Sequence, residues 1–217
     1  MIRKLSLAVM AVLLLAGVTI LAQTDSTEPA KVVPAPIPTI VPEGVLYDFE
    51  GDTIVLRHGW IGVTDTLIGG RSTSVLSIVA DGANGSKQAL QMTGTVISDN
   101  PYVMFGGGSS RFGHDSLIAF DVSGLTGVRF WAKGDGNTYR IDLPTAGITD
   151  YMFYSFAFTP PADEWREYKI PFKGFKQQPY GAKVPWTGTD VIGVHFFTVG
   201  GPLEKFKLLV DQIEFYK

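Results

Sequence analysis

Carboxylates near both ends of the strand-like part of the sequence have the residue types of a site for a hard cation. Asp48, Glu50 and Asp52 lie in YDFEGD, and Asp211 lies in LVDQIEFY. Oxygen ligands suit calcium, and weak calcium sites are common in extracellular domains. The first and last strands of a sandwich often lie side by side, so these acids could converge on an ion. The alternative is solvated acids at strand ends.

A second set of residues has the composition of a sugar-binding surface. Short segments carry aromatic side chains next to arginine, aspartate and histidine, as in GVRFWAK, TYRIDL, YMFYSFAF and VIGVHFFTV. Flat rings offer apolar area to the C–H face of a pyranose, and fixed polar groups pair with its hydroxyls. The candidate ligand-binding residues are Trp131, Arg140, Asp142, Tyr151, Tyr154 and His195. The alternative is that the aromatic residues belong to the core.

The sequence contains few of the motifs that are typical of enzyme active sites. The histidines His58, His114 and His195 have no HExxH spacing, and no GxSxG motif occurs. Ser109 and Asp115 lie close to His114 in sequence, but a triad is recognised by geometry. Any two of the 21 acids could meet across a sheet to hydrolyse a glycoside, yet no pair stands out. We expect no catalytic residue and no enzymatic activity.

Two glycine-rich segments, GGRSTS and FGGGSSRFG, could be taken for phosphate-binding loops. A Walker A loop needs a lysine after its last glycine and a helix behind it. Here the strand-like segments SVLSIVA and SLIAFD follow instead. Both glycine-rich segments are therefore predicted to be flexible turns.

The elements that must position these residues are predicted to be strands. About ten short runs rich in β-branched and aromatic residues are separated by Gly, Asn, Asp and Pro. No window of helical length has a sustained apolar stripe. In GVRFWAK the apolar Val128, Phe130 and Ala132 share one face, and KGDGN (133–137) is predicted to be a hairpin loop. So many strands in one domain predict two packed antiparallel sheets, a β-sandwich.

The N-terminal part is predicted to be an export signal followed by a spacer. Residues 1–22 have a basic start, an uncharged apolar run and a small residue, Ala22, as in a secretory signal peptide. A retained membrane anchor is the alternative. Residues 23–44 carry five prolines and are typical of a semi-rigid linker. We expect residues 45–217 to form one domain of a periplasmic, cell-surface or secreted protein.

The net charge and the cysteine content exclude several classes of partner and of chemical site. The 217 residues carry a net charge of −3 without a basic run, which argues against nucleic acid. The absence of cysteine excludes disulfides, thiolate nucleophiles and cysteine-bound zinc.

Four segments together resemble the CIA30 (complex I intermediate-associated protein 30) family. They are WIGVTDTLIGGRSTSVLSI, VRFWAKGDGNTYRIDL, WREYKIPFKGF and LLVDQIEFY. Asp65-Thr66-Leu67-Ile68 departs from the Asp-Gly-Val-Met usual in that family. The resemblance covers residues 45–217 and extends to family 11 carbohydrate-binding modules of the galactose-binding-like superfamily.

This resemblance implies a jelly-roll β-sandwich with a ligand site on a concave sheet face. It places calcium at Glu50 and Asp211. It also implies that the glycine pair is structural: Gly69 and Gly70 allow a sharp turn, because glycine adopts positive φ freely, and Arg71 and Ser72 tie the turn down. The function expected is a non-catalytic module that binds a polysaccharide or an envelope glycan. The alternatives are an assembly factor or scaffold that binds a protein, and a polysaccharide-active enzyme.

Overall fold

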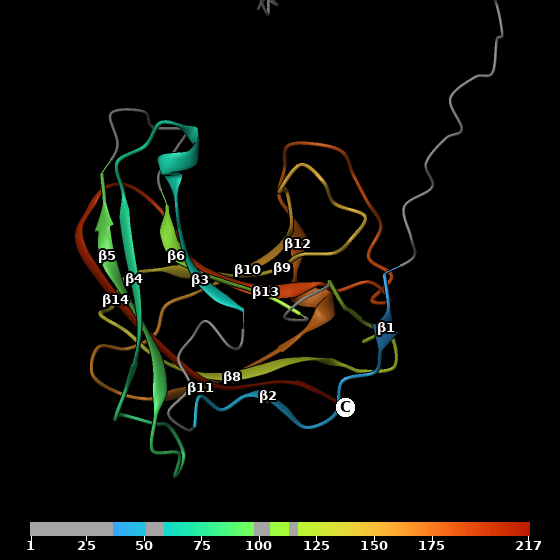
Figure 1. Cartoon of the computed structure of the whole chain (residues 1–217), viewed down its shortest axis with the longest axis horizontal. Helices are drawn as coiled ribbons and strands as arrows, with labels where there is room; N and C mark the ends of the chain where they lie inside the picture. The colour runs from blue at the N-terminus through green and yellow to red at the C-terminus, as the bar shows by residue number, and fades with distance from the viewer. Residues whose placement is uncertain (1–36, 51–58, 98–104, 113–116) are drawn as a thin grey trace, which may run out of the picture. The chain divides into compact units, whose positions relative to one another are not determined.

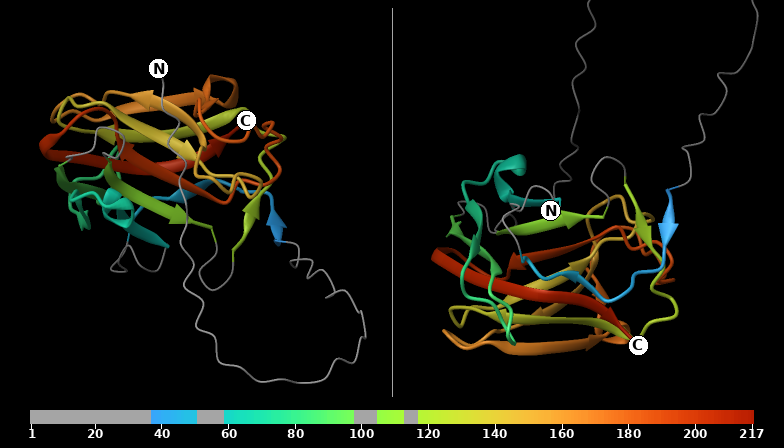
Figure 2. Two further views of the ribbon diagram at one scale, coloured as in Figure 1. Left: turned by 90° about the horizontal axis from the view of Figure 1, so that it is seen from above. Right: turned by 60° about the horizontal axis from the view of Figure 1, so that its bottom comes forward.

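The strands form two sheets packed face to face. The structure is a computed structural model that describes residues 37–50, 59–97, 105–112 and 117–217. The first sheet has the order β12 (Lys176–Gln177), β10 (Tyr154–Phe158), β9 (Tyr139–Leu143), β13 (Gly193–Thr198), β6 (Gly106–Arg111), β3 (Trp60–Thr64). The second has the order β11 (Arg166–Pro171), β8 (Gly127–Lys133), β14 (Leu203–Tyr216), β5 (Ala89–Val96), β4 (Thr73–Val79), with β2 (Val45–Tyr47) also paired to β14. Neighbouring strands in both sheets are antiparallel (Figures 1 and 2), so the predicted all-β sandwich is confirmed.

The core lies between the sheets and is rich in aromatic rings. Val128, Phe130 and Ala132 are buried as the alternation predicted. From the first sheet, Trp60 is fully buried, and its ring lies 5.4 Å from that of Tyr47 at a steep angle. Edge-to-face pairs of this kind add to the stabilisation that burial itself provides. A large, specific core explains how a domain without disulfides holds two sheets in register.

One glycine-rich segment predicted to be a turn is a central strand. Residues Gly106–Arg111 form β6, which pairs with β13 on one side and β3 on the other. A Cβ added at Gly107 would overlap the carbonyl oxygen of Phe196 on β13. Glycine is therefore needed here because the neighbouring backbone approaches closely. An argument from strand propensity counts the same glycine as evidence against a strand.

The predicted hairpin at residues 133–137 is also wrong. β8 and β9 flank this segment but belong to different sheets. Asp135 accepts hydrogen bonds from the backbone N–H groups of Asn137 (3.0 Å) and Lys207 (2.7 Å), which ties the turn to β14. The segment therefore carries the chain from the second sheet to the first.

Part of the segment predicted as a linker pairs with the domain. Thr39–Ile40 forms β1, which runs parallel to β7 (Ala119–Phe120). The described residues also include two short 3-10 helices, η2 (Asp65–Ile68) and η3 (Phe172–Gly174). The predicted signal peptide and most of the predicted linker lie outside the described residues. Within those residues, no helix has the length and apolar character needed to span a membrane.

Candidate functional site

The outer face of the first sheet, the side turned away from the second sheet, brings most of the candidate residues together. Strand register places Asp142 of β9 between Ser155 of β10 and His195 of β13. Arg140, two residues before Asp142, lies beside Phe197 on the same face. In Figure 1, η2 and the loops of residues 144–153 and 178–190 rise on either side of this face. Four of the six predicted ligand-binding residues, Arg140, Asp142, Tyr151 and His195, belong to this region.

A row of five rings crosses this face. Tyr151 contacts Phe153 at 6.0 Å between ring centres, and Phe153 contacts His195 at 5.3 Å. The row continues from His195 to Phe197 at 5.6 Å and from Phe197 to Phe105 at 5.4 Å. Tyr151 is the open end of the row, with 78% of its surface exposed. Phe105, Phe153 and Phe197 were not predicted as site residues, although alternation places Phe153 with Tyr151 and Phe197 with His195.

Tyr151 also has an unusual backbone. Its φ angle is 64°, in the left-handed region that non-glycine residues seldom occupy. Such strain costs on the order of 1 kcal/mol and is found more often at binding and active sites. A large exposed ring on a strained backbone therefore supports a ligand contact at this residue.

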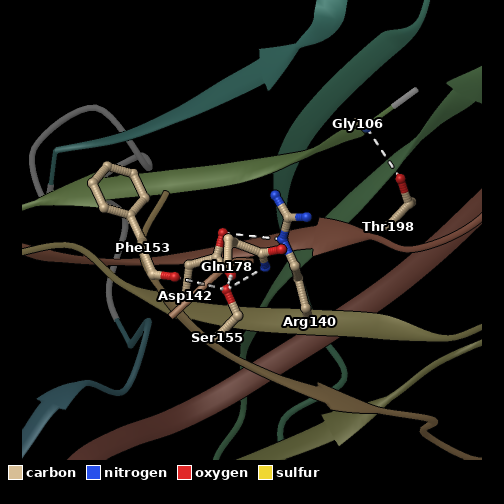
Figure 3. A network of polar contacts seen from close by, with 7 residues as sticks. All are labelled: Gly106, Arg140, Asp142, Phe153, Ser155, Gln178 and Thr198. Carbon is tan, nitrogen blue, oxygen red and sulfur yellow. Dashed lines mark hydrogen bonds and ion pairs between the residues drawn. The ribbon is translucent and has the colours of Figure 1, made fainter. Parts of the chain in front are cut away.

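A polar network lies beside the row of rings. The Asp142 carboxylate accepts hydrogen bonds from Arg140 Nε at 3.1 Å and from Ser155 Oγ at 2.6 Å. Gln178 Nε2 donates to Ser155 Oγ at 2.8 Å, which links the 178–190 loop to the sheet. Figure 3 shows the Phe153 ring and the Arg140 guanidinium standing on the same side of β9.

Burial decides the chemistry of the titratable groups in the site. Asp142 is only 2% exposed, and burial raises the pKa of its carboxyl, an effect that Arg140 and Ser155 partly offset. Burial also lowers the pKa of His195 to about 3, helped by the positive charges of Arg140 and Arg111. His195 is therefore neutral at pH 7. Its buried Nδ1 atom has no hydrogen-bond partner among the residues that the structure describes.

The other two candidate ligand-binding residues lie elsewhere. Tyr154 is on the core side of β10, where its hydroxyl donates to Val184 O at 2.6 Å and its ring contacts Trp186. Trp131 is half-buried on the outer face of the second sheet, paired in register with Glu167 and Asp211. Neither residue shares a surface with the row of rings.

The turn at GGRS is built around the buried carboxylate of Asp65. Ser72 donates to it twice, from its backbone N–H (3.0 Å) and its hydroxyl (2.6 Å). Gly69 caps η2 with a φ of 88°, and a Cβ added at Gly70 would overlap the Asp65 carboxylate. Phe105 N–H also donates to Asp65, at 3.3 Å. This turn, with the exposed Arg71 in it, therefore anchors the backbone of the last ring in the row.

Two of the carboxylates predicted to bind calcium, Glu50 and Asp211, both form hydrogen bonds with the loop of residues 81–88. Glu50 Oε1 accepts hydrogen bonds from Ser86 Oγ and the backbone N–H groups of Lys87 and Gln88, and Asp211 Oδ2 accepts one from Ala83 N–H. Burial raises the pKa of Asp211, and the nearby charge of Glu50 adds to that shift. A cation would relieve this repulsion, but the described residues contain no group of three or more acids or histidines that could hold a metal, so an ion here would have only these two carboxylates with backbone or water oxygens as ligands. Asp48 is exposed and accepts from Glu50 N–H, while Asp52 lies outside the described residues.

Comparison with known proteins identifies the family. The model of the complex I intermediate-associated protein 30 (CIA30) family matches residues 47–210, three quarters of the chain. The chain belongs to the CIA30 family. The match includes all five rings and the Asp65 turn, and it ends one residue before Asp211. None of the curated proteins matches this CIA30 sequence.

Solved structures confirm the fold of this CIA30 domain. It is similar to the family 11 carbohydrate-binding module of a cellulosomal cellulase of Clostridium thermocellum, with a TM-score of 0.58 and 20% identity over 82% of this chain and 95% of that one. The family 11 module of the same organism in complex with a β-1,3-1,4-mixed-linked tetrasaccharide gives a TM-score of 0.59 and 20% identity over 82% and 96% of the two chains. These likenesses establish a jelly-roll β-sandwich.

The low pKa of His195 predicts a specific pH dependence of the CIA30 domain's stability. The unfolded chain binds a proton at His195 below its ordinary pKa of 6.5, whereas the folded domain does not until about pH 3. Acidification through that window therefore favours unfolding. Between about pH 6.5 and pH 5 we expect His195 to lower the free energy of unfolding by about 1.5 kcal/mol.

Chemical denaturation of the wild type and His195→Gln at several pH values measures this effect. The difference between the two isolates His195 from the other histidines. Parallel pH profiles for the two proteins would contradict the buried, neutral imidazole.

Proposed function

We propose that this CIA30 domain is a non-catalytic carbohydrate-binding module, and that its ligand lies on the outer face of the first sheet. The exposed Tyr151 ring at the open end of the row, on the same face as the half-buried Arg140, carries the proposal. Tyr151 is 78% exposed and can stack on a sugar unit, whereas Phe153 and Phe197 are only 9% and 6% exposed and support it from beneath. Arg140, which is oriented by Asp142, supplies a fixed hydrogen-bonding group beside the row, and such groups give a sugar site its specificity.

The related structures support this function. The matched family 11 modules are carbohydrate-binding proteins by description, and one of them holds a mixed-linked tetrasaccharide. On this shared fold the present chain places the exposed Tyr151 and Arg111 and the half-buried Arg140 at the outer face of the first sheet.

The arrangement of acids supports binding rather than hydrolysis. A glycosidase of the usual kind needs two carboxyl groups about 5–10 Å apart around the scissile bond. Asp150, in the loop next to Tyr151, accepts hydrogen bonds from the backbone N–H groups of Met152 and Ala182. Among the described strand residues that point to the outer face of the first sheet, Asp142 is the only carboxylate. It is held by Arg140 and Ser155 and is buried beneath them. It therefore positions other groups instead of reaching a bond in the ligand.

The setting that we propose is outside the cytoplasm. The N-terminal residues have the pattern of an export signal followed by a proline-rich spacer, and polysaccharides and envelope glycans are encountered there. The spacer would hold the domain away from a membrane or a neighbouring module.

Affinity electrophoresis tests the proposed function. The wild-type protein is run in native gels that contain polysaccharides of different linkage, and reducing ends are measured in parallel. We expect retardation by at least one polysaccharide and no release of reducing ends. Release of reducing ends would assign the domain to the enzymes instead.

We further propose that Glu50 and Asp211 hold a structural calcium ion next to the 81–88 loop. When bound, the ion would neutralise the two carboxylates and stabilise the folded state. With a dissociation constant of about 0.1–1 mM, about 5 mM calcium adds about 1–2 kcal/mol to the free energy of unfolding. The expected result is a lower melting temperature in EDTA.

Asp211→Asn is expected to abolish the calcium-dependent shift in melting temperature, whereas Asp121→Asn, a surface acid bonded to Ser123, retains it. An equal shift in the Asp211→Asn protein would place any calcium elsewhere.

A further inference from the structure

The outer face of the first sheet is positively charged although the chain as a whole is negative. Strand register places Arg140, Arg111 and Lys176 on this face, on β9, β6 and β12. Against these three cations stand one carboxylate among the outward residues of the described strands, Asp142, and one in the adjoining 144–153 loop, Asp150. The net charge of the whole chain is −3. The overall composition of the chain is acidic and does not explain why positive charge gathers on this one face.

Arg140 directs its unused donors away from Asp142. Only its Nε atom bonds to Asp142, at 3.1 Å, and neither terminal nitrogen has a partner within the described residues. The guanidinium carbon lies 5.5 Å from the centre of the Phe197 ring, so the ring supports the group from one side. Figure 3 shows the two terminal nitrogens on the far side of the group from Asp142. This geometry leaves a planar pair of donors facing outward.

Asp142 orients the Arg140 side chain but accepts a hydrogen bond from only one of its nitrogens. The Asp142 side chain accepts from Ser155 as well as from Arg140 Nε, and only 2% of the residue is exposed. It therefore cannot contact a ligand directly. It acts as a positioning residue that fixes the direction of the Arg140 fork.

Arg111 extends the positive region to the other side of His195. It is exposed, and no ion pair of Arg111 is formed within the described part of the chain. Strand register places Arg111 opposite Gly193, two residues from His195 on the same face, and both arginines help to lower the pKa of His195. The neutral ring between them adds a flat surface and no further charge. The row of rings is thus flanked by two cations.

We propose that the sugar ligand is anionic, and that a carboxylate or sulfate group on it binds the free fork of Arg140, with Arg111 as a second contact. This inference rests on the proposed carbohydrate function. A guanidinium fork matches a carboxylate or sulfate with two parallel N–H···O bonds. The exposed Tyr151 ring binds a sugar face, and the arginines select polymers that carry negative charge.

Isothermal titration with paired probes tests the proposal. Polygalacturonate and alginate supply carboxylates, carrageenan supplies sulfate, and mixed-linked β-glucan is neutral. Carboxyl-reduced polygalacturonate keeps the backbone and loses the charge. We expect at least one anionic polymer to bind at least about tenfold more tightly than the neutral ones. Raising salt from about 50 to about 500 mM should weaken that binding.

Substitutions locate the effect. Arg140→Gln is expected to weaken binding of the anionic polymer by about tenfold to a hundredfold, because a charge-assisted bidentate contact is lost. Arg111→Gln should weaken it less and does not disturb the Asp142 network, so it serves if Arg140→Gln fails to fold. The matched control is Arg129→Gln. Arg129 is an arginine on the second sheet, paired there with Glu214 and Glu167.

The outcomes separate this inference from the function on which it rests. Equal binding of neutral and anionic polymers, with Arg140→Gln unaffected, overturns the inference and leaves the carbohydrate function standing. Equal losses in Arg129→Gln and Arg140→Gln would indicate unspecific charge attraction and also overturn it. A folded protein that binds no polysaccharide of either kind overturns both.

Discussion

Replacement of Tyr151 by alanine is expected to lower the affinity for a polysaccharide by about tenfold or more, without loss of the fold. Tyr151 is the most exposed member of the row of rings and contacts the others only through Phe153. Removal of one well-placed aromatic contact at a binding surface commonly costs about 2 kcal/mol of binding free energy. Because 78% of the residue is exposed, the core loses little.

A second substitution at Tyr151 separates binding from folding. Glycine accepts the φ of 64° without strain, so Tyr151→Gly should be more stable than Tyr151→Ala by about 1 kcal/mol and equally poor at binding. The matched control is Tyr216→Ala, which removes a half-buried tyrosine from β14 in the second sheet, where it lies under Lys169. Titration calorimetry and thermal melts measure both quantities. Unchanged affinity in Tyr151→Ala would remove this end of the row from the site.

Replacement of Asp65 by alanine is expected to lower the free energy of unfolding by about 3 kcal/mol or more. The fully buried carboxylate accepts three hydrogen bonds, from Ser72 N–H, Ser72 Oγ and Phe105 N–H. Its removal leaves those donors buried without partners, and each costs about 1–3 kcal/mol. Because Phe105 N–H is one of them, the same change should also loosen the last ring of the row and weaken ligand binding.

Asp121 provides a matched control for Asp65. It also accepts from a serine N–H (3.0 Å) and the same serine's hydroxyl (2.6 Å), both in Ser123, but at the surface. Asp121→Ala leaves these donors free to bond to water, so its effect should be much smaller. Urea denaturation of both variants gives the comparison. Similar losses in the two proteins would show that the Asp65 turn is not a special anchor.

The face of the sheet to which each strand residue points could be predicted from the sequence, because side chains alternate between the two faces from one residue to the next. This alternation placed Arg140 and Asp142 on the opposite face from Tyr139, Ile141 and Leu143, and the strand pairing confirms that division of faces, although Asp142 is also buried. It could not decide which face of the 151–158 segment points outward, since both carry aromatic residues. That choice depends on the pairing of Ser155 with Asp142, a contact between strands. Tyr151 and Tyr154 therefore looked equivalent in the sequence.

Long-range contacts explain what sequence patterns missed. β6 was predicted as a turn because glycine has low strand propensity, yet the close approach of β13 excludes a side chain at Gly107. The turn at residues 133–137 has the glycine and aspartate residues typical of a hairpin loop, but Asp135 accepts a hydrogen bond from Lys207 N–H, 72 residues away. The contact of Phe105 with Phe197 likewise depends on the pairing of β6 with β13.

A glycan array probed with the wild-type protein and with Tyr151→Ala tests the central claim most directly. The outer face of the first sheet is proposed to bind sugar, so the wild type should bind one class of polysaccharide and the variant should not. Circular dichroism on the same samples establishes that both are folded. A blank array with folded wild-type protein would contradict the account and make the row of rings an interface for a protein partner.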